Sequence, residues 1–262
     1  MSAITSRRNP IVARFREVAR SDAFLAVIDG WHLLHEAAAT GIGIELVAVA
    51  EQPDREPDAK LLTRLERSGV NVVNVSANVM NALSPVKTPT GIVSLVRRRP
   101  WNIEGATSGE QPLVLAAVDI QDPGNIGAMI RSAEAGGATG AICAGMTADP
   151  WSWKALRAAM GSTFRLPLHY DRDAAHVCQA LRERGLRVVA TMIHGARPMQ
   201  EVDLRGPTAL FLGGEGVGLD PQILRAADSR ITIPMQPPVE SLNVAVAAGV
   251  LVYEARRQRM AS

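Results

Sequence analysis

Apolar and polar positions in the second half of the chain follow patterns typical of strands and of helices in turn. Residues 113–118 form a continuous apolar run, which is typical of a parallel strand buried on both faces. We expect further strands at 138–144, 187–191, 208–212 and 230–233, and helices at 125–135, 151–160, 174–184 and 242–259. This alternation of strands and helices predicts an α/β fold with a mainly parallel sheet.

The first half shows the same alternation on a smaller scale. We expect strands at 24–28, 44–50, 70–75 and 92–96, and helices at 9–18, 31–39 and 59–67. A stretch rich in Gly, Ser, Thr and Pro lies between Arg97 and Pro112, and this composition is typical of a linker. The pattern therefore predicts a small α/β domain at 1–104, a linker at 105–111 and a larger α/β domain at 112–262.

The helix expected at 9–18 is amphipathic. Asn9 is a suitable N-cap and Pro10 suits the first helical position, so that Ile11, Phe15 and Val18 share one apolar face. The first twenty residues hold five arginines and one acid, namely Arg7, Arg8, Arg14, Arg16, Arg20 and Glu17. Two interpretations remain open: a surface that binds RNA phosphates, with Arg7, Arg8 and Arg14 as the expected contacts, or a solvated amphipathic helix.

Composition narrows the class of protein. The 262 residues are 47% hydrophobic and 21% charged, which is typical of a globular protein and excludes a disordered or collagen-like chain. Cys143 and Cys178 are too few for a disulfide framework and fit a reducing cytoplasm. No apolar stretch follows the first arginines, so we expect no secretory signal. The run 244–253 is too short to cross a membrane, and its apolar character predicts a helix buried in the fold or against a second subunit.

Three strand ends carry side chains suited to chemistry. Ligands in open α/β sheets bind beyond the carboxyl ends of the strands. The first of these ends is followed by 122–127, and Asn125 and Arg131 lie six residues apart on the helix expected there. The second opens into the glycine-rich segment 213–218, where Glu215 is the one side chain able to carry charge.

The third strand end leads into the final helix. Ser241 is the expected N-cap, and Asn243 follows it at a helix N-terminus, which favours negative charge. Each of the three segments also has a purely structural interpretation as a turn, a cap or a surface charge. The glycine spacing is not the dinucleotide fingerprint, which argues against a nicotinamide-dependent dehydrogenase.

Together and in this order, the three segments resemble the three motifs of the SpoU (TrmH-type) branch of the SPOUT RNA methyltransferases. Motif one is similar to 122–132, motif two to 211–219 and motif three to 233–247. Residues 154–162 also resemble a stretch that the family carries between motifs one and two. The resemblance covers nearly all of 112–262.

The first half resembles the L30e-like RNA-binding domain of family members that act on ribosomal RNA. Residues 8–10, 24–30 and 90–93 carry this resemblance. Ser21-Asp22 stands where many relatives have a dense basic turn, and Thr90 stands where relatives often have Gln. Both departures concern the RNA target and not the class of enzyme.

The resemblance implies methyl transfer from S-adenosylmethionine to a ribose 2′-hydroxyl of RNA, a C-terminal trefoil knot and a homodimer formed by the C-terminal domain. The implied catalytic residues are Arg131, Asn125, Glu215, Ser241 and Asn243. The implied cofactor-binding residues are Thr191, Leu212, Gly213, Gly214, Gly216, Ile233, Met235, Ser241 and Leu242. Arg131 is also an implied RNA contact, and it acts either as the base or by holding phosphate and stabilising the oxyanion.

The resemblance leaves the RNA substrate open. Ribosomal RNA, in particular 23S rRNA, is the expected substrate; transfer RNA, or a non-catalytic RNA-binding protein that keeps the fold, are the alternatives. S-adenosylmethionine is already activated, so the reaction requires no metal, and the scattered histidines show no metal-ligand spacing. We therefore expect a cytoplasmic enzyme without metal or membrane.

Overall fold

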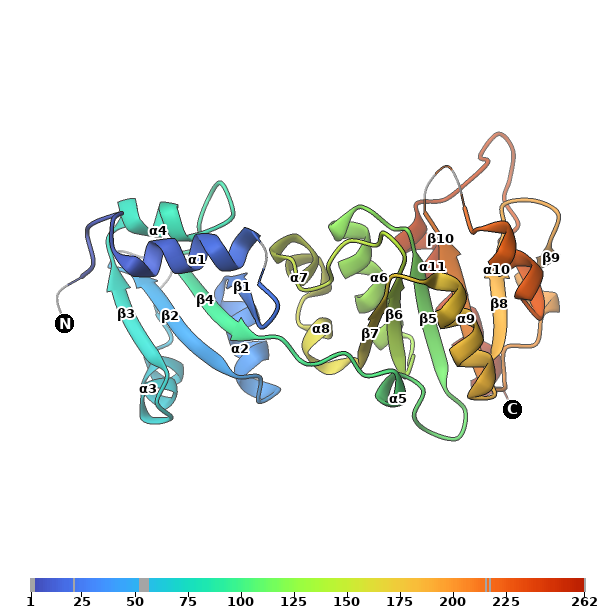
Figure 1. Cartoon of the computed structure of the whole chain (residues 1–262), viewed down its shortest axis with the longest axis horizontal. Helices are drawn as coiled ribbons and strands as arrows, with labels where there is room; N and C mark the ends of the chain where they lie inside the picture. The colour runs from blue at the N-terminus through green and yellow to red at the C-terminus, as the bar shows by residue number, and fades with distance from the viewer. Residues whose placement is uncertain (1–2, 21, 52–56, 215, 217, 262) are drawn as a thin grey trace. The chain divides into compact units, whose positions relative to one another are not determined.

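The structure is a computed structural model that describes residues 3–20, 22–51, 57–214, 216 and 218–261. The chain forms two compact units, Met1–Pro100 with Trp151–Phe164, and Trp101–Pro150 with Arg165–Ser262 (Figure 1). The sequence predicts functional domains at 1–104 and 112–262, joined by a linker at 105–111. These functional bounds stay a prediction. None of the described helices is long and apolar enough to cross a membrane.

The first unit is built on a four-stranded sheet with the order β1-β4-β2-β3. The strand β4 runs antiparallel to both of its neighbours, whereas β2 and β3 are parallel. The strands are β1 (Leu25–Asp29), β2 (Ile44–Ala50), β3 (Asn71–Val75) and β4 (Ile92–Arg97). The helices are α1 (Pro10–Arg20), α2 (Trp31–Ala39), α3 (Ala59–Arg67), α4 (Ala77–Leu83) and α7 (Trp153–Ala159), and α8 follows at Ser162–Arg165.

Both faces of this sheet are covered. Along β1, Leu25 packs into the core beneath α1 and α4, and Ala26 packs into the core on the other face. Trp151, Leu156 and Phe164 complete that second core from a distant part of the sequence. These contacts explain why the segment around α7 belongs to the first unit.

The helix α1 begins at Pro10 as the sequence predicts. The Asn9 side chain accepts a hydrogen bond from the Ile11 amide at 3.0 Å. The predicted apolar face is confirmed, because Phe15 and Val18 are buried in one core and Ile11, half-buried, packs against it. Val12 is also buried in this core.

The second unit contains a seven-stranded sheet in which every pair is parallel, with the order β7-β6-β5-β10-β8-β11-β9. The strands are β5 (Leu113–Val118), β6 (Gly140–Ala144), β7 (Leu168–Asp171), β8 (Arg187–Thr191), β9 (Arg197–Pro198), β10 (Thr208–Gly213) and β11 (Ser229–Thr232). The helices are α5 (Ile103–Ala106), α6 (Pro123–Ala135), α9 (Ala174–Glu183), α10 (Pro221–Ala226) and α11 (Val244–Met260), with a 3₁₀ turn at Met199–Glu201. The predicted α/β fold with a mainly parallel sheet is confirmed.

The helices α6 and α11 pack side by side in the same direction. Near their starts, the Asn125 and Asn243 side chains are hydrogen-bonded. At the other end a Cβ atom on Gly136 would overlap the side chain of Val252, so only glycine allows this close approach. Since α11 packs against α6 inside the unit, part of its apolar surface is buried within the fold.

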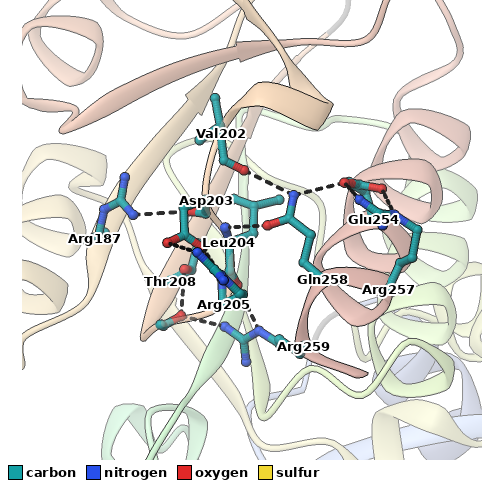
Figure 2. A network of polar contacts seen from close by, with 11 residues as sticks. Arg187, Val202, Asp203, Leu204, Arg205, Thr208, Glu254, Arg257, Gln258 and Arg259 are labelled. Atoms are coloured by element: carbon teal, nitrogen blue, oxygen red, sulfur yellow. Dashed lines mark hydrogen bonds and ion pairs between the residues drawn. The ribbon is translucent and has the colours of Figure 1, made fainter. Parts of the chain in front are cut away.

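The C-terminal end of α11 is fixed by polar contacts (Figure 2). The Gln258 amide donates to the Val202 carbonyl at 3.1 Å and accepts from the Leu204 amide at 2.8 Å. The Arg259 guanidinium donates to the carbonyl of Leu204 at 2.9 Å. It also donates to the carbonyl of Gln111 at 2.7 Å. These bonds tie α11 to the segments before β5 and β10.

The close approach of α6 and α11 predicts different effects of two glycine substitutions on the free energy of unfolding. We expect Gly136→Ala to reduce the free energy of unfolding by about 1–3 kcal/mol, because its methyl group would force the helices apart. Gly249→Ala places its Cβ at an ordinary 3.5 Å from the Ser132 hydroxyl and should be neutral or slightly stabilising, since alanine favours a helix. Urea denaturation measures both, and equal effects of the two substitutions would contradict the packing described.

Candidate active site

A cavity of about 360 Å³ lies in the second unit at the carboxyl ends of β8, β10 and β11. This volume is in the range of small-molecule sites. Its walls are largely apolar, with Leu219, Ile231, Val244 and Leu251 among them. Among the described residues that line it, His194 is the one ionisable side chain. The largely apolar walls therefore suit a partly apolar group such as a nucleoside.

All of the residues expected to bind the cofactor line this cavity. They are Thr191, Leu212, Gly213, Gly214, Gly216, Ile233, Met235, Ser241 and Leu242. Several further residues line the cavity that the sequence does not lead one to expect, among them Met192, Ile193 and His194. They follow directly after the strand that ends at Thr191, at the edge of the sheet where ligands bind, and this position could have identified them.

Two glycines of the 213–218 segment are required by close approaches of the backbone. A Cβ on Gly213 would overlap the backbone of Gly218, and one on Gly214 would lie 2.5 Å from the carbonyl oxygen of Asp119. The Gly218 amide donates to the Gly214 carbonyl at 3.1 Å, which closes the base of the loop. Glu215, expected to be catalytic, lies outside the described residues.

Asp119 is a residue at this edge that the sequence analysis missed. It follows β5 directly and has a φ of 56°, a left-handed conformation that Asp tolerates better than most residues. Its carboxylate accepts a hydrogen bond from the Met146 amide at 2.7 Å. Asp119 thus joins the loop after β6 to the glycine loop. An acidic residue directly after a buried strand was the available signal.

The first turns of α6 and α11 are linked by their side chains. Asn243 caps α11, because its Oδ1 accepts from the Ala245 amide at 2.9 Å. Its Nδ2 donates to the Oδ1 of Asn125 at 3.0 Å. The backbone amide of Asn125 in turn donates to the carboxylate of Asp122, the N-cap of α6, at 2.9 Å. The side chains of two sequence motifs thus meet at one edge of the sheet.

The expectation that Ser241 caps the final helix is wrong. The helix begins at Val244, two residues later than predicted, and Asn243 is its cap. The side chain of Asn243 accepts hydrogen bonds from backbone amides of the first turn. Ser241 lies two residues earlier, too far from these amides to accept the same bonds. Ser241 instead lines the cavity.

Arg131 is exposed on α6 and does not appear among the described residues that line the cavity. It lies about 9 Å along the helix axis from Asn125, at 1.5 Å per residue. The structure therefore brings together Asn125 and Asn243, places Ser241 in the cavity wall and leaves Arg131 on the neighbouring helix surface.

Arg7, Arg8 and Arg14, the expected RNA contacts of the first unit, are all exposed. Arg7 donates to the backbone carbonyl of Asn78 at 3.1 Å. Arg14 forms ion pairs with Glu17 at 3.2 Å and Asp22 at 3.3 Å, so its charge is partly compensated. The three side chains place positive charge on the surface of the first unit.

No group of three His, Cys, Asp or Glu side chains is arranged to hold a metal ion in the part of the chain that the structure describes. Cys143 and Cys178 are both free thiols and both buried. Burial raises the pKa of the Cys143 thiol to about 12, so this group stays protonated at neutral pH and is a poor nucleophile.

Comparison with known families covers both halves of the chain. The profile of the SpoU rRNA methylase family matches residues 112–253, and that of the MRM3-like substrate-binding domain matches residues 14–94. The protein named 23S rRNA (guanosine(2553)-2′-O)-methyltransferase RlmP from Bacillus subtilis is 32% identical, over 92% of this chain and 91% of its own length. The 23S rRNA (guanosine-2′-O-)-methyltransferase RlmB of Photobacterium profundum is 30% identical, over 89% and 98% of the two chains.

Solved structures agree with these relatives. The AdoMet-bound rRNA methyltransferase from Sinorhizobium meliloti superimposes with a TM-score of 0.87 at 29% identity, over 98% of this chain and 97% of that chain. The SpoU methyltransferase AviRb from Streptomyces viridochromogenes, in complex with AdoMet, gives a TM-score of 0.86 at 26% identity, over 97% and 100%.

The fold, the cavity at the strand ends and the matched profile define the class of this protein as an RNA methyltransferase that uses S-adenosylmethionine. The chain belongs to the SpoU rRNA methylase family.

Asn243 both caps α11 and donates to Asn125, and two substitutions separate these roles. Asn243→Ala removes the cap of α11 and should reduce the free energy of unfolding by about 1 kcal/mol. Asn243→Asp keeps a capping oxygen but removes the donor to Asn125, so stability should be retained while methyl transfer falls. Thermal denaturation and a methyl-transfer assay measure the two effects. An Asn243→Asp variant with full activity would show that the bond to Asn125 has no part in catalysis.

Proposed function

We propose that this chain methylates the ribose 2′-hydroxyl of a guanosine in 23S rRNA, in the cytoplasm, with S-adenosylmethionine as the donor. The observation that carries the proposal is the cavity at the strand ends, whose lining contains every residue expected to bind the cofactor. The RlmP and RlmB relatives support the choice of 23S rRNA and guanosine, since each matches most of this chain.

The cavity suits S-adenosylmethionine. Apolar walls such as Leu219 and Leu251 fit an adenine ring, while Thr191 and the backbone after β10 offer hydrogen-bonding groups. Glycine at 213 and 214 lets the backbone close tightly around the cavity without side chains in the way. When bound, S-adenosylmethionine supplies a methyl group on a positively charged sulfur, already activated for transfer. The contribution of the chain is therefore to position the acceptor and to stabilise the charge that develops on it.

Arg131 is the proposed catalytic residue. A guanidinium is a poor base, so Arg131 acts by binding a phosphate of the RNA and by stabilising the oxyanion that forms on the ribose. The methyl group passes from sulfur to the ribose oxygen as the sulfur–methyl bond breaks, and the hydroxyl proton leaves to solvent water. Because Arg131 is exposed on α6, RNA can approach it from solvent. The guanidinium fork binds phosphate through two parallel hydrogen bonds, a geometry that lysine does not offer.

The other proposed site residues hold Arg131 and the acceptor in place. Asn243 and Asn125 join the starts of α11 and α6, and α6 carries Arg131. We assign Ser241 and Glu215 to the orientation of the ribose and of the glycine loop. Domain 1–104 is the proposed RNA-binding part, and 112–262 the catalytic part.

We also propose that the chain forms a homodimer and that its C-terminal part contains a trefoil knot. Val246, Tyr253 and Met260 are exposed apolar residues spaced seven apart on α11, which places them on one face of the helix. A stripe of this kind is typical of a helix that packs against a partner. We propose that this face of α11 forms the dimer interface.

Nucleoside analysis tests the proposed reaction. Purified protein, S-adenosylmethionine and protein-free 23S rRNA, 16S rRNA or transfer RNA should give 2′-O-methylguanosine in the 23S rRNA alone. Arg131→Ala should reduce the rate of transfer by about a hundredfold or more, because a preorganised charge at the oxyanion is lost. Its affinity for S-adenosylmethionine should be unchanged, since Arg131 lies outside the cavity. Methylation of transfer RNA alone, methylation of a base, or full activity of Arg131→Ala would each contradict the proposal.

Sedimentation velocity tests the dimer. Tyr253→Asp should convert a dimer into a monomer at micromolar concentration, because a charge would be buried in an apolar interface. The control is Met146→Asp, at an exposed apolar residue of the loop after β6, which should leave the dimer intact. A wild-type monomer, or a Tyr253→Asp variant that remains dimeric, would overturn the proposed interface.

A further inference from the structure

Phe24 differs from the other phenylalanines of the chain. Its side chain is 79% exposed, whereas Phe15, Phe164 and Phe211 are fully buried. Burial of a phenylalanine side chain is worth about 1.5–3 kcal/mol, which an exposed ring does not gain. Phe24 lies in the first unit, directly before β1.

The backbone of Phe24 is fixed on both sides. Its amide donates to the Asp22 carboxylate at 2.8 Å, and its carbonyl accepts from the Arg98 amide at 2.8 Å. The same carboxylate oxygen of Asp22 accepts from the Leu25 amide at 2.9 Å. The exposed ring therefore projects from a rigid turn and not from a loose loop, so little entropy is lost when a ligand binds it.

Charged groups surround this turn. Arg14 contacts the second carboxylate oxygen of Asp22 at 3.3 Å, and the Nε of Arg98 donates to the Leu25 carbonyl at 2.9 Å. Two acids near the turn, Asp22 and Glu17, both pair with Arg14. The pKa of Asp22 lies below its usual value, chiefly because of the bond from the Phe24 amide, so the carboxylate is ionised at neutral pH. The acids thus hold the turn together, and the Arg98 guanidinium is bonded to the backbone directly after Phe24.

An exposed aromatic ring next to arginine has the chemistry of a site for single-stranded RNA. Unpaired bases stack on aromatic side chains, and nearby arginines attract the phosphates. Phe24 also lies within the residues that match a substrate-binding domain profile. Asp22 occupies the turn where the resemblance leads one to expect a dense basic cluster, so this chain has less charge there and an ordered ring beside it.

We propose that Phe24 is a stacking platform for an unpaired base of the RNA substrate, held in place by Asp22 and supported by the positive charge of Arg98. This inference rests on the proposed function, because it assumes that RNA is the substrate. It assigns a specific contact to the first unit, and that contact is made by stacking and not by charge alone.

Binding of two RNA probes to the full chain tests the inference. The probes are a fluorescent oligoadenylate single strand and the same strand paired with its complement. Phe24→Leu keeps an apolar side chain but cannot stack in the same way, so it should weaken binding of the single strand by about five-fold to a hundred-fold. Phe24→Trp should bind as tightly as the wild type or more tightly, and the duplex should respond little to either substitution.

Salt dependence separates stacking from charge. Phe24→Leu should leave the slope of log affinity against log salt unchanged, because no phosphate contact is lost. The matched control is Arg98→Gln, which should lower the slope by about 0.7 for a single strand if its charge neutralises one phosphate. Wild-type single-strand affinity in Phe24→Leu would overturn the inference. A change in oligomeric state on Phe24→Leu would overturn it as well, since the ring would then be a protein contact.

The methyl-transfer assay distinguishes this inference from the proposed function. If wild-type protein methylates 23S rRNA and Phe24→Leu does so with the same KM and kcat, the stacking contact is wrong and the function stands. If wild-type protein transfers no methyl group to RNA, the proposed function fails. A rise in KM for RNA with little change in kcat, and unchanged affinity for S-adenosylmethionine, is the result expected for Phe24→Leu.

Discussion

The hydrogen bond between Asn243 and Asn125 places the starts of α6 and α11 side by side. Asn243 can make this bond and cap its own helix at once, because an amide side chain offers both a donor and an acceptor. From this point the two helices run in parallel and stay close as far as Gly136. The cavity is bounded by the start of α11, and Arg131 is carried by α6. One contact between side chains therefore connects the cofactor cavity to the proposed catalytic residue, although the two come from distant parts of the sequence.

The carboxyl edge of the large sheet is built by backbone more than by side chains. Asp119 in a left-handed conformation, the glycines at 213 and 214 and the bond that closes the glycine loop bring three loops within contact distance. Such an edge suits a donor that is already activated, because it needs a shaped pocket and few catalytic groups. The first unit has a different chemistry, with exposed arginines and an ordered aromatic ring that suit an extended and flexible ligand. Separation of these tasks between two compact units agrees with transfer of a small group to a large RNA.

The sequence was sufficient to predict the long elements and which residues line one cavity at the strand ends. The apolar run 113–118 became β5 with the same bounds. The glycines at 213–218 predict a backbone that can approach a ligand closely; in the structure, Gly213 and Gly214 allow close approaches of backbone to backbone. Helices of about two turns or less, such as α4 and α10, escaped detection because they are too short to show a period. The cap of α11 was placed at Ser241 because serine and asparagine are both good caps, and only the tertiary contact with Asn125 explains why Asn243 holds this position. The exposure of Phe24 was equally beyond prediction, since Phe24 and Leu25 are both apolar and only the end of the strand separates them.

A double-mutant cycle on Asn125 and Asn243 tests the central claim most directly. The rate of methyl transfer to 23S rRNA is measured for the wild type, Asn125→Ala, Asn243→Asp and the double variant. If the two side chains act as one unit, the double variant is no slower than the more impaired single variant, with a coupling energy of about 0.5–3 kcal/mol. If the effects of the two substitutions simply add, the bond between the helices does not connect the cavity to the catalytic residue, and this account of the site is wrong.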